Sequence, residues 1–128
     1  MIRAQYFFHQ SDDGLLAWDI RRLVELSKDL PIEHIDIAQI AELDENHWYT
    51  HGCESPTCRS LLQHMQLIEK ADLAFPVILD QDGRVMDGMH RVCRAVREGK
   101  DYILAVRFPA NPEPDFAGCD PDELPYDE

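Results

Sequence analysis

Residues 75–99 follow the order strand, tight turn, strand and helix, and this run constrains the fold more than any other part of the sequence. The apolar run at its start predicts a buried strand, and Asp82-Gly83 is typical of a hairpin turn into a second strand at 84–86. Asp87-Gly88 then begins a helix, which Gly99 ends as the residue after its last turn. The predicted apolar face of that helix consists of Met89, Val92, Cys93 and Val96.

The rest of the pattern predicts further strands and helices around this unit. We expect strands at residues 2–8, near 35–37 and at 102–108, and a single turn at 39–43. Capping candidates at 11–13 predict a helix to about residue 29, and Ser55-Pro56 predicts the start of another. The expected apolar stripes are Leu16, Ile20, Leu23 and Val24 in the first helix, and Leu61, Leu62, Met65 and Ile68 in the second.

A chain of 128 residues is long enough to bury one core. Strands and helices alternate irregularly around a central hairpin, so we predict the α+β class, with a small mixed sheet and packed helices. We expect this domain to occupy residues 1–108 and an acidic, proline-rich tail to occupy 109–128. The tail is interpreted as solvated, although Asp120-Pro121-Asp122-Glu123 could form one helical turn and Phe116, Leu124 and Tyr126 could attach it to the domain.

Charge is distributed unevenly along the chain. Twelve Lys and Arg residues against 25 Asp and Glu residues give a formal net charge of −13, of which −7 belongs to the tail. So acidic a chain is not expected to hold nucleic acid by its phosphates or to dock on an anionic membrane. In contrast, residues 84–107 carry six bases and three acids. This local excess of positive charge favours a small anionic ligand.

The sequence also indicates a cellular location. It contains no run of 18 apolar residues that could span a membrane, and residues 1–10 do not resemble a secretory signal. We therefore expect a cytoplasmic protein whose four cysteines are free thiols.

The start of the helix after Asp87 has the composition of a phosphate site. Free backbone N–H groups and the positive end of the helix dipole attract anions there, and Gly88 allows close approach to the backbone. His90 and Arg91 could donate hydrogen bonds to phosphate oxygens. The alternative is structural: Asp87 is the N-cap, His90 and Arg91 are solvated, and Arg94 pairs with Glu98.

The Asp-Gly-x-His-Arg sequence at 87–91, after a strand, a turn and a strand, resembles the ParB/sulfiredoxin fold superfamily over about residues 32–108. This superfamily includes N-terminal domains of ParB-type partition proteins, sulfiredoxins and ADP-dependent free serine kinases. The resemblance implies that the 87–91 loop, including Met89, holds the phosphates of a nucleotide. It also implies that Thr57 and Arg59, at the start of the preceding helix, contribute to the nucleotide site.

Two members of the superfamily fit poorly. Met89 stands where sulfiredoxins carry their catalytic cysteine, so sulfinic acid reduction is not expected. Partition proteins continue into a helix-turn-helix and a dimerisation domain, whereas this chain continues into an acidic tail, so DNA segregation is not expected either.

The resemblance to the serine kinases implies phosphoryl transfer from ATP or ADP, with Mg²⁺, to a small metabolite with a hydroxyl group. Such a reaction needs a general base, and the resemblance points to one of Glu42, Asp44 and Glu45. The alternative function is a nucleotide sensor or protein-interaction module without catalysis, whose acidic tail contacts another protein.

A second cluster of potential ligands consists of His47, His51, Cys53 and Cys58. Its spacing does not match the two close pairs that zinc sites usually have, so no metal site is expected. Trp48 and Tyr49 could stack on a base or pack on the core, and His9, His34 and His64 are interpreted as isolated structural or surface residues.

Overall fold

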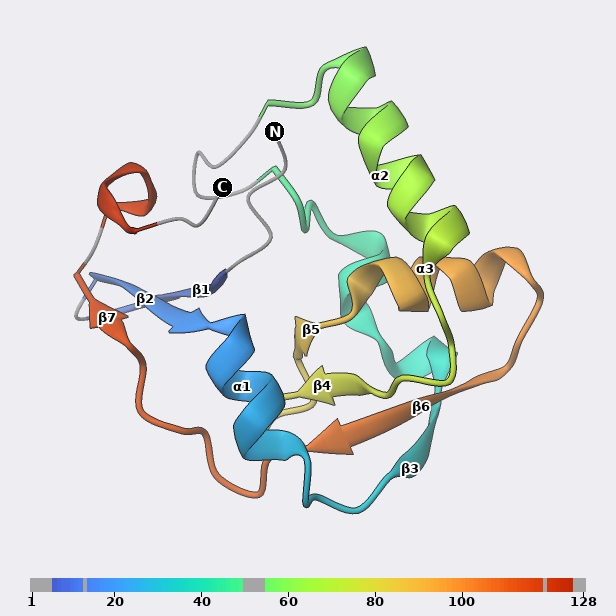
Figure 1. Cartoon of the computed structure of the whole chain (residues 1–128), viewed down its shortest axis with the longest axis horizontal. Helices are drawn as coiled ribbons and strands as arrows, with labels where there is room; N and C mark the ends of the chain where they lie inside the picture. Colours follow the sequence, from blue (N-terminus) through green and yellow to red (C-terminus); the bar gives the residue numbers. More distant parts are fainter. Residues whose placement is uncertain (1–5, 13, 50–54, 119, 126–128) are drawn as a thin grey trace.

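The computed structural model describes residues 6–12, 14–49, 55–118 and 120–125. Within these residues the chain forms three α-helices and two sheets, which confirms the α+β class (Figure 1). The strands are β1 (Tyr6–Ser11), β2 (Gly14–Asp19), β3 (Glu33–Asp36), β4 (Val77–Leu79), β5 (Val85–Asp87), β6 (Tyr102–Arg107) and β7 (Phe116–Ala117). The α-helices are α1 (Ile20–Ser27), α2 (Cys58–Lys70) and α3 (Met89–Arg97), and the 3-10 helices are η1 (Ile37–Gln39), η2 (Ala41–Asp44) and η3 (Pro121–Glu123).

The larger sheet has the strand order β3-β6-β4-β5 and is mixed. β6 is antiparallel to β3 and parallel to β4, and β4 is antiparallel to β5. β4 is buried on both faces, to which its successive side chains point in turn, whereas the edge strand β3 is mostly exposed. Val77 and Leu79 of β4 pack with α3, η1 and the segment after it, whereas Ile78 packs with Trp18 and Leu23 of the α1 side. The sheet therefore lies between α1 on one face and α3 on the other.

The predicted unit of strand, turn, strand and helix is present, but its first strand, expected to be buried from Phe75 on, begins only at Val77, and Phe75 is exposed. The carboxylate of Asp80 accepts hydrogen bonds from the backbone N–H groups of Asp82 and Arg84, both at 2.9 Å, and so closes the turn between β4 and β5. Gly83 has a φ of 82° in this turn. Gly99 has a φ of 73° directly after the end of α3, which confirms its predicted place.

The predicted helix from 11–13 to residue 29 is wrong over its first half. Residues 14–19 form β2, which pairs with β1 on one edge and with β7 on the other. α1 begins only at Ile20, where the carboxylate of Asp19 accepts from the backbone N–H of Arg21. A helical stripe could be drawn through Leu16 and Ile20, but pairing with strands distant in the sequence overrides this local preference.

The start of α2 and its buried face both differ from the prediction. Thr57 caps the helix, accepting from the backbone N–H of Ser60, so Ser55 is not the N-cap. The buried side chains are Ser60 and His64, at 6% and 1% exposure. The predicted apolar stripe mostly faces outward, with Leu61, Leu62 and Met65 between 48% and 60% exposed.

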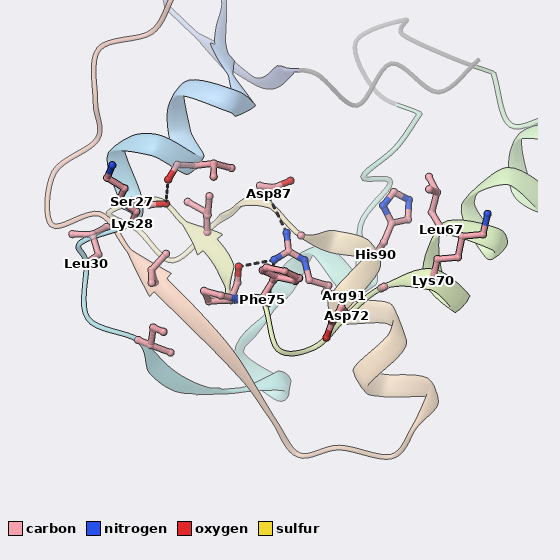
Figure 2. Close-up of a pocket in the computed structure, with 17 residues that line it drawn as sticks. Ser27, Lys28, Leu30, Leu67, Lys70, Asp72, Phe75, Asp87, His90 and Arg91 are labelled. Carbon is pink, nitrogen blue, oxygen red and sulfur yellow. Dashed lines mark hydrogen bonds and ion pairs between the residues drawn. The ribbon is translucent and has the colours of Figure 1, made fainter. Parts of the chain in front are cut away.

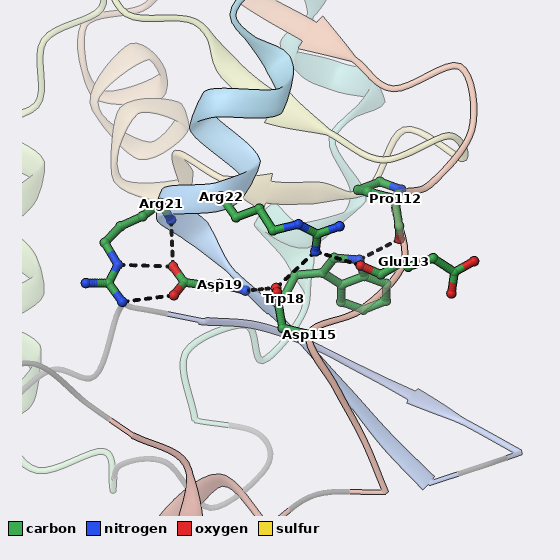
Figure 3. Close-up of polar contacts among 7 residues, drawn as sticks. All are labelled: Trp18, Asp19, Arg21, Arg22, Pro112, Glu113 and Asp115. Atoms are coloured by element: carbon green, nitrogen blue, oxygen red, sulfur yellow. Dashed lines mark hydrogen bonds and ion pairs between the residues drawn. The ribbon is translucent and has the colours of Figure 1, made fainter.

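The described residues of the expected tail, 109–118 and 120–125, are mostly exposed, but they are attached to the domain through Phe116 and Leu124, as the alternative expected; Tyr126 lies outside the described residues. β7 pairs with β2, η3 forms at the predicted turn, and Leu124 is buried against Tyr6 and Ala17. Figure 3 shows how the start of this segment is held: the Nε1 of Trp18 donates to the carbonyl of Pro112, and Asp115 accepts from the backbone N–H of Asp19 and from Arg22. The segment is thereby attached to the β1-β2 hairpin and α1.

None of the helices in the described part of the chain is long and apolar enough to cross a membrane.

Candidate functional site

A groove of about 690 Å³ lies on the α1 side of the larger sheet (Figure 2). Its walls are formed by the end of α1, by the end of α2 with the segment that follows, and by the start of α3. Side chains of β4 and β6 also line the groove. Its apolar lining residues are Val24, Leu30, Ile32, Leu67, Ala71, Phe75, Pro76, Ile78 and Val106. The remaining lining residues are Ser27, Lys28, Lys70, Asp72, Asp87, Gly88, His90 and Arg91. The groove therefore includes four of the five residues of the 87–91 loop.

Gly88 is the N-cap of α3, with a φ of 107° that favours glycine. A Cβ at this position would lie 2.7 Å from Cγ1 of Val77, so glycine is also needed for close packing of the loop on β4. The structural alternative, in which Asp87 is the N-cap, is wrong on this point, because the N-cap is Gly88 and has no side-chain hydrogen bond. Met89 and His90 are the first two residues of α3, so their backbone N–H groups have no intrahelical acceptor. His90 lines the groove, whereas Met89 is 5% exposed and is not part of the described lining.

Arg91 connects the start of α3 to the segment before β4 through hydrogen bonds. Its Nη1 donates to the carbonyl oxygens of Phe75 and Pro76, at 3.1 and 2.6 Å, and its Nη2 donates to Asp87 at 2.9 Å. Most of its donors are therefore bound within the protein. We infer that Arg91 has a structural role besides lining the groove, and Asp87 is its ion-pair partner.

His90 belongs to a cluster of three stacked rings, which the sequence did not predict. Its Nε2 lies 2.8 Å from Nδ1 of His64, and the indole of Trp48 is stacked on both imidazoles, with ring centroids 4.1 Å from His64 and 4.9 Å from His90. Burial, with smaller effects of His64, His47 and Arg91, lowers the pKa of His90 to about 4. At neutral pH His90 is therefore an uncharged donor or acceptor and not a cation.

The expectation that His64 is isolated is wrong, although the residue is structural: it is buried and contacts His90 and Trp48. The one hint in the sequence is that His64 follows Ser60 by four positions, which places both polar side chains on one face of a helix. Nothing in the sequence shows that this face is the buried one, nor that residue 90 lies beside it.

Positive charge in the groove comes mainly from residues outside the predicted loop. Lys28 and Lys70 line it with Arg91, against the two carboxylates of Asp72 and Asp87. This positive charge is partly offset, because Lys28 is paired with Glu25 at 2.6 Å and Arg91 with Asp87 at 2.9 Å. Sequence reasoning missed both lysines, because each stands at the end of a different helix and only the tertiary structure brings them together.

The three candidate bases lie elsewhere. Glu42 is buried at 4% exposure and accepts from the backbone N–H of Val85, and its Oε1 has no hydrogen-bond partner among the described residues. Glu45 is exposed and forms an ion pair with Arg84, which lowers the pKa of the Glu45 carboxyl. Asp44 is exposed. The structure brings none of the three to the described lining of the groove.

Thr57 and Arg59 are likewise not among the described residues of the groove. The hydroxyl of Thr57 is used in capping α2, and Arg59 is exposed. In the second cluster, Cys58 is an exposed free thiol, whereas His51 and Cys53 lie outside the described residues. The described part of the chain holds no group of three or more His, Cys, Asp and Glu side chains placed to bind one metal ion.

The fold and the groove define an α+β protein with a partly apolar, partly cationic surface groove beside a helix start. No family model, curated protein or solved structure matches the chain.

Proposed function

We propose that this protein binds a nucleotide in the groove, with the phosphates at the start of α3. The single observation that carries the proposal is that Lys70 and the first turn of α3 lie on one side of the same groove, with Lys28 across it (Figure 2). Backbone N–H groups and ammonium groups are the donors that phosphates take in proteins. The unit of β4, β5 and α3 supports the expected relation to the ParB/sulfiredoxin fold, which we retain as part of the proposal.

The described geometry favours binding over phosphoryl transfer. Glu42, Asp44 and Glu45 are absent from the described lining of the groove, and Asp87 is engaged by Arg91. Mg²⁺ in this proposal arrives with the phosphates and keeps part of its water shell, as it commonly does with nucleotides.

The test is a thermal-shift panel of ATP, ADP, CTP and GTP with Mg²⁺, followed by affinity measurements for the nucleotide that binds. Lys70→Ala should weaken binding roughly tenfold, because a hydrogen bond to a charged group contributes about 1.5 kcal/mol. Lys100→Ala is the matched control, since Lys100 is an exposed lysine that does not line the groove.

Two results would contradict the proposal. One is a wild-type melting temperature that no nucleotide raises. The other is equal weakening by Lys70→Ala and Lys100→Ala, which would show that only the overall charge matters. Consumption of the nucleotide in the presence of a hydroxyl-bearing metabolite would instead restore phosphoryl transfer as the function.

A further inference from the structure

The apolar part of the groove contains three large side chains that are left exposed. Val24 is 51%, Ile32 is 60% and Phe75 is 65% exposed, and all three line the groove. Isolated exposed apolar residues are common on protein surfaces, but several that share one concave surface indicate a site that a ligand covers.

Phe75 is held in place by its backbone. Its carbonyl accepts from Arg91, as does that of Pro76, and its N–H donates to the carbonyl of Asp72 at 3.2 Å. The segment between α2 and β4 is thereby bound to Arg91, in the first turn of α3. The aromatic ring is presented to the groove from a fixed backbone, which lowers the entropy lost when a ligand orders it.

Two lysines flank this apolar surface. Figure 2 shows Phe75 and Arg91 between two sides of the groove, with Lys28, which is paired with Glu25, on one side and Lys70 and the uncharged His90 on the other. A ligand that fits must therefore combine an apolar surface with negative charge. A nucleotide has this combination, because its base has two apolar faces and its phosphates are anionic.

We propose that Phe75 is the stacking platform for the base of the nucleotide, so that base and phosphates occupy adjoining parts of one groove. This inference rests on the proposed function and adds the residue that distinguishes a nucleotide from a simple polyphosphate. The base lies against the ring of Phe75 and the neighbouring apolar wall of Val24 and Ile32. The phosphates reach Lys70 and the first N–H groups of α3.

The experiment compares the affinities of ATP and of inorganic tripolyphosphate, both with Mg²⁺, by isothermal titration calorimetry. The wild type should bind ATP more tightly than tripolyphosphate. Phe75→Ala should weaken ATP binding by roughly tenfold, the scale of base stacking on an aromatic side chain, and leave tripolyphosphate binding unchanged. Phe75→Trp should keep the preference for ATP, because it retains an aromatic face.

Tyr102→Ala is the matched control, since Tyr102 is an aromatic residue at 60% exposure on β6 and is not part of the described lining. Equal affinities of the wild type for the two ligands would overturn the stacking platform alone. The same conclusion would follow if Phe75→Ala changed both affinities equally or changed neither. Failure of the wild type to bind either ligand would overturn the proposed function as well, so the two failures are distinguishable.

Discussion

His64 and His90 share a hydrogen bond of 2.8 Å between Nδ1 and Nε2, although 26 positions separate them in the chain. His64 is buried at 1% exposure, and His90 lines the groove. One nitrogen of the pair donates this hydrogen bond: if it is Nδ1 of His64, the proton of neutral His90 is on its Nδ1, and if it is Nε2 of His90, that nitrogen carries the proton. Through this hydrogen bond, a residue that lines the groove contacts a buried residue of α2.

The first prediction concerns stability against pH. The pKa of His90 falls from 6.5 to about 4 on folding, so between these values the unfolded chain binds a proton that the folded chain does not. The free energy of unfolding should therefore fall as the pH drops from 6.5 to 4, by at most about 1.4 kcal/mol per pH unit from this residue. Urea denaturation at several pH values measures the slope.

His90→Gln should remove this part of the slope, whereas His34→Gln, at an exposed position, should leave it unchanged. An identical slope in wild type and His90→Gln would show that His90 is not a neutral buried imidazole in the folded protein.

The second prediction concerns Gly88. Replacement by alanine adds a Cβ 2.7 Å from the Val77 side chain at a φ of 107°, so Gly88→Ala should destabilise the fold. We expect a loss of about 3 kcal/mol, from backbone strain and overpacking together. Gly83→Ala is the comparison, because its φ is 82° but nothing lies within 4 Å of the added Cβ, so only the strain of about 1 kcal/mol applies. Similar losses for both would mean that Val77 yields easily to the added group.

The third prediction separates Glu42 from Glu45. Glu42→Ala should cost about 2 kcal/mol of stability, because it leaves the buried N–H of Val85 without its acceptor. Glu45→Ala breaks an exposed ion pair with Arg84 and should cost less than about 1 kcal/mol. Denaturation curves of the two variants test this difference. If Glu42→Ala were as stable as the wild type, the buried carboxylate would not be required for the fold, and a functional role for it would have to be reconsidered.

The fourth prediction concerns the attachment of residues 109–125. Asp115→Ala removes the acceptor of the Asp19 N–H and of the Arg22 guanidinium, and should lower stability by about 1 kcal/mol. Glu113→Ala should have little effect, since Arg22 contacts the backbone carbonyl of Glu113 and not its carboxylate. Melting temperatures of the two variants provide the comparison, and equal shifts would argue against the observed contacts of Asp115.

Only the 87–91 loop of the candidate site could be predicted from the sequence, and its chemistry could not. The 87–91 loop does stand at the start of a helix beside a groove. The charge of His90, the internal contacts of Arg91 and the presence of Lys28 and Lys70 could not be predicted, because each depends on burial or on residues distant in the chain.

The sequence by itself determined the unit from β4 to the end of α3, because its signals are local. Asp82-Gly83 specifies a turn, and Gly88 and Gly99 bound the helix through backbone conformations that neighbouring residues set. The tertiary structure alone decided that residues 14–19 are a strand and that α2 buries Ser60 and His64 while exposing Leu62. A strand needs partners and a helix face needs a neighbour, and here both come from parts of the chain far away in sequence.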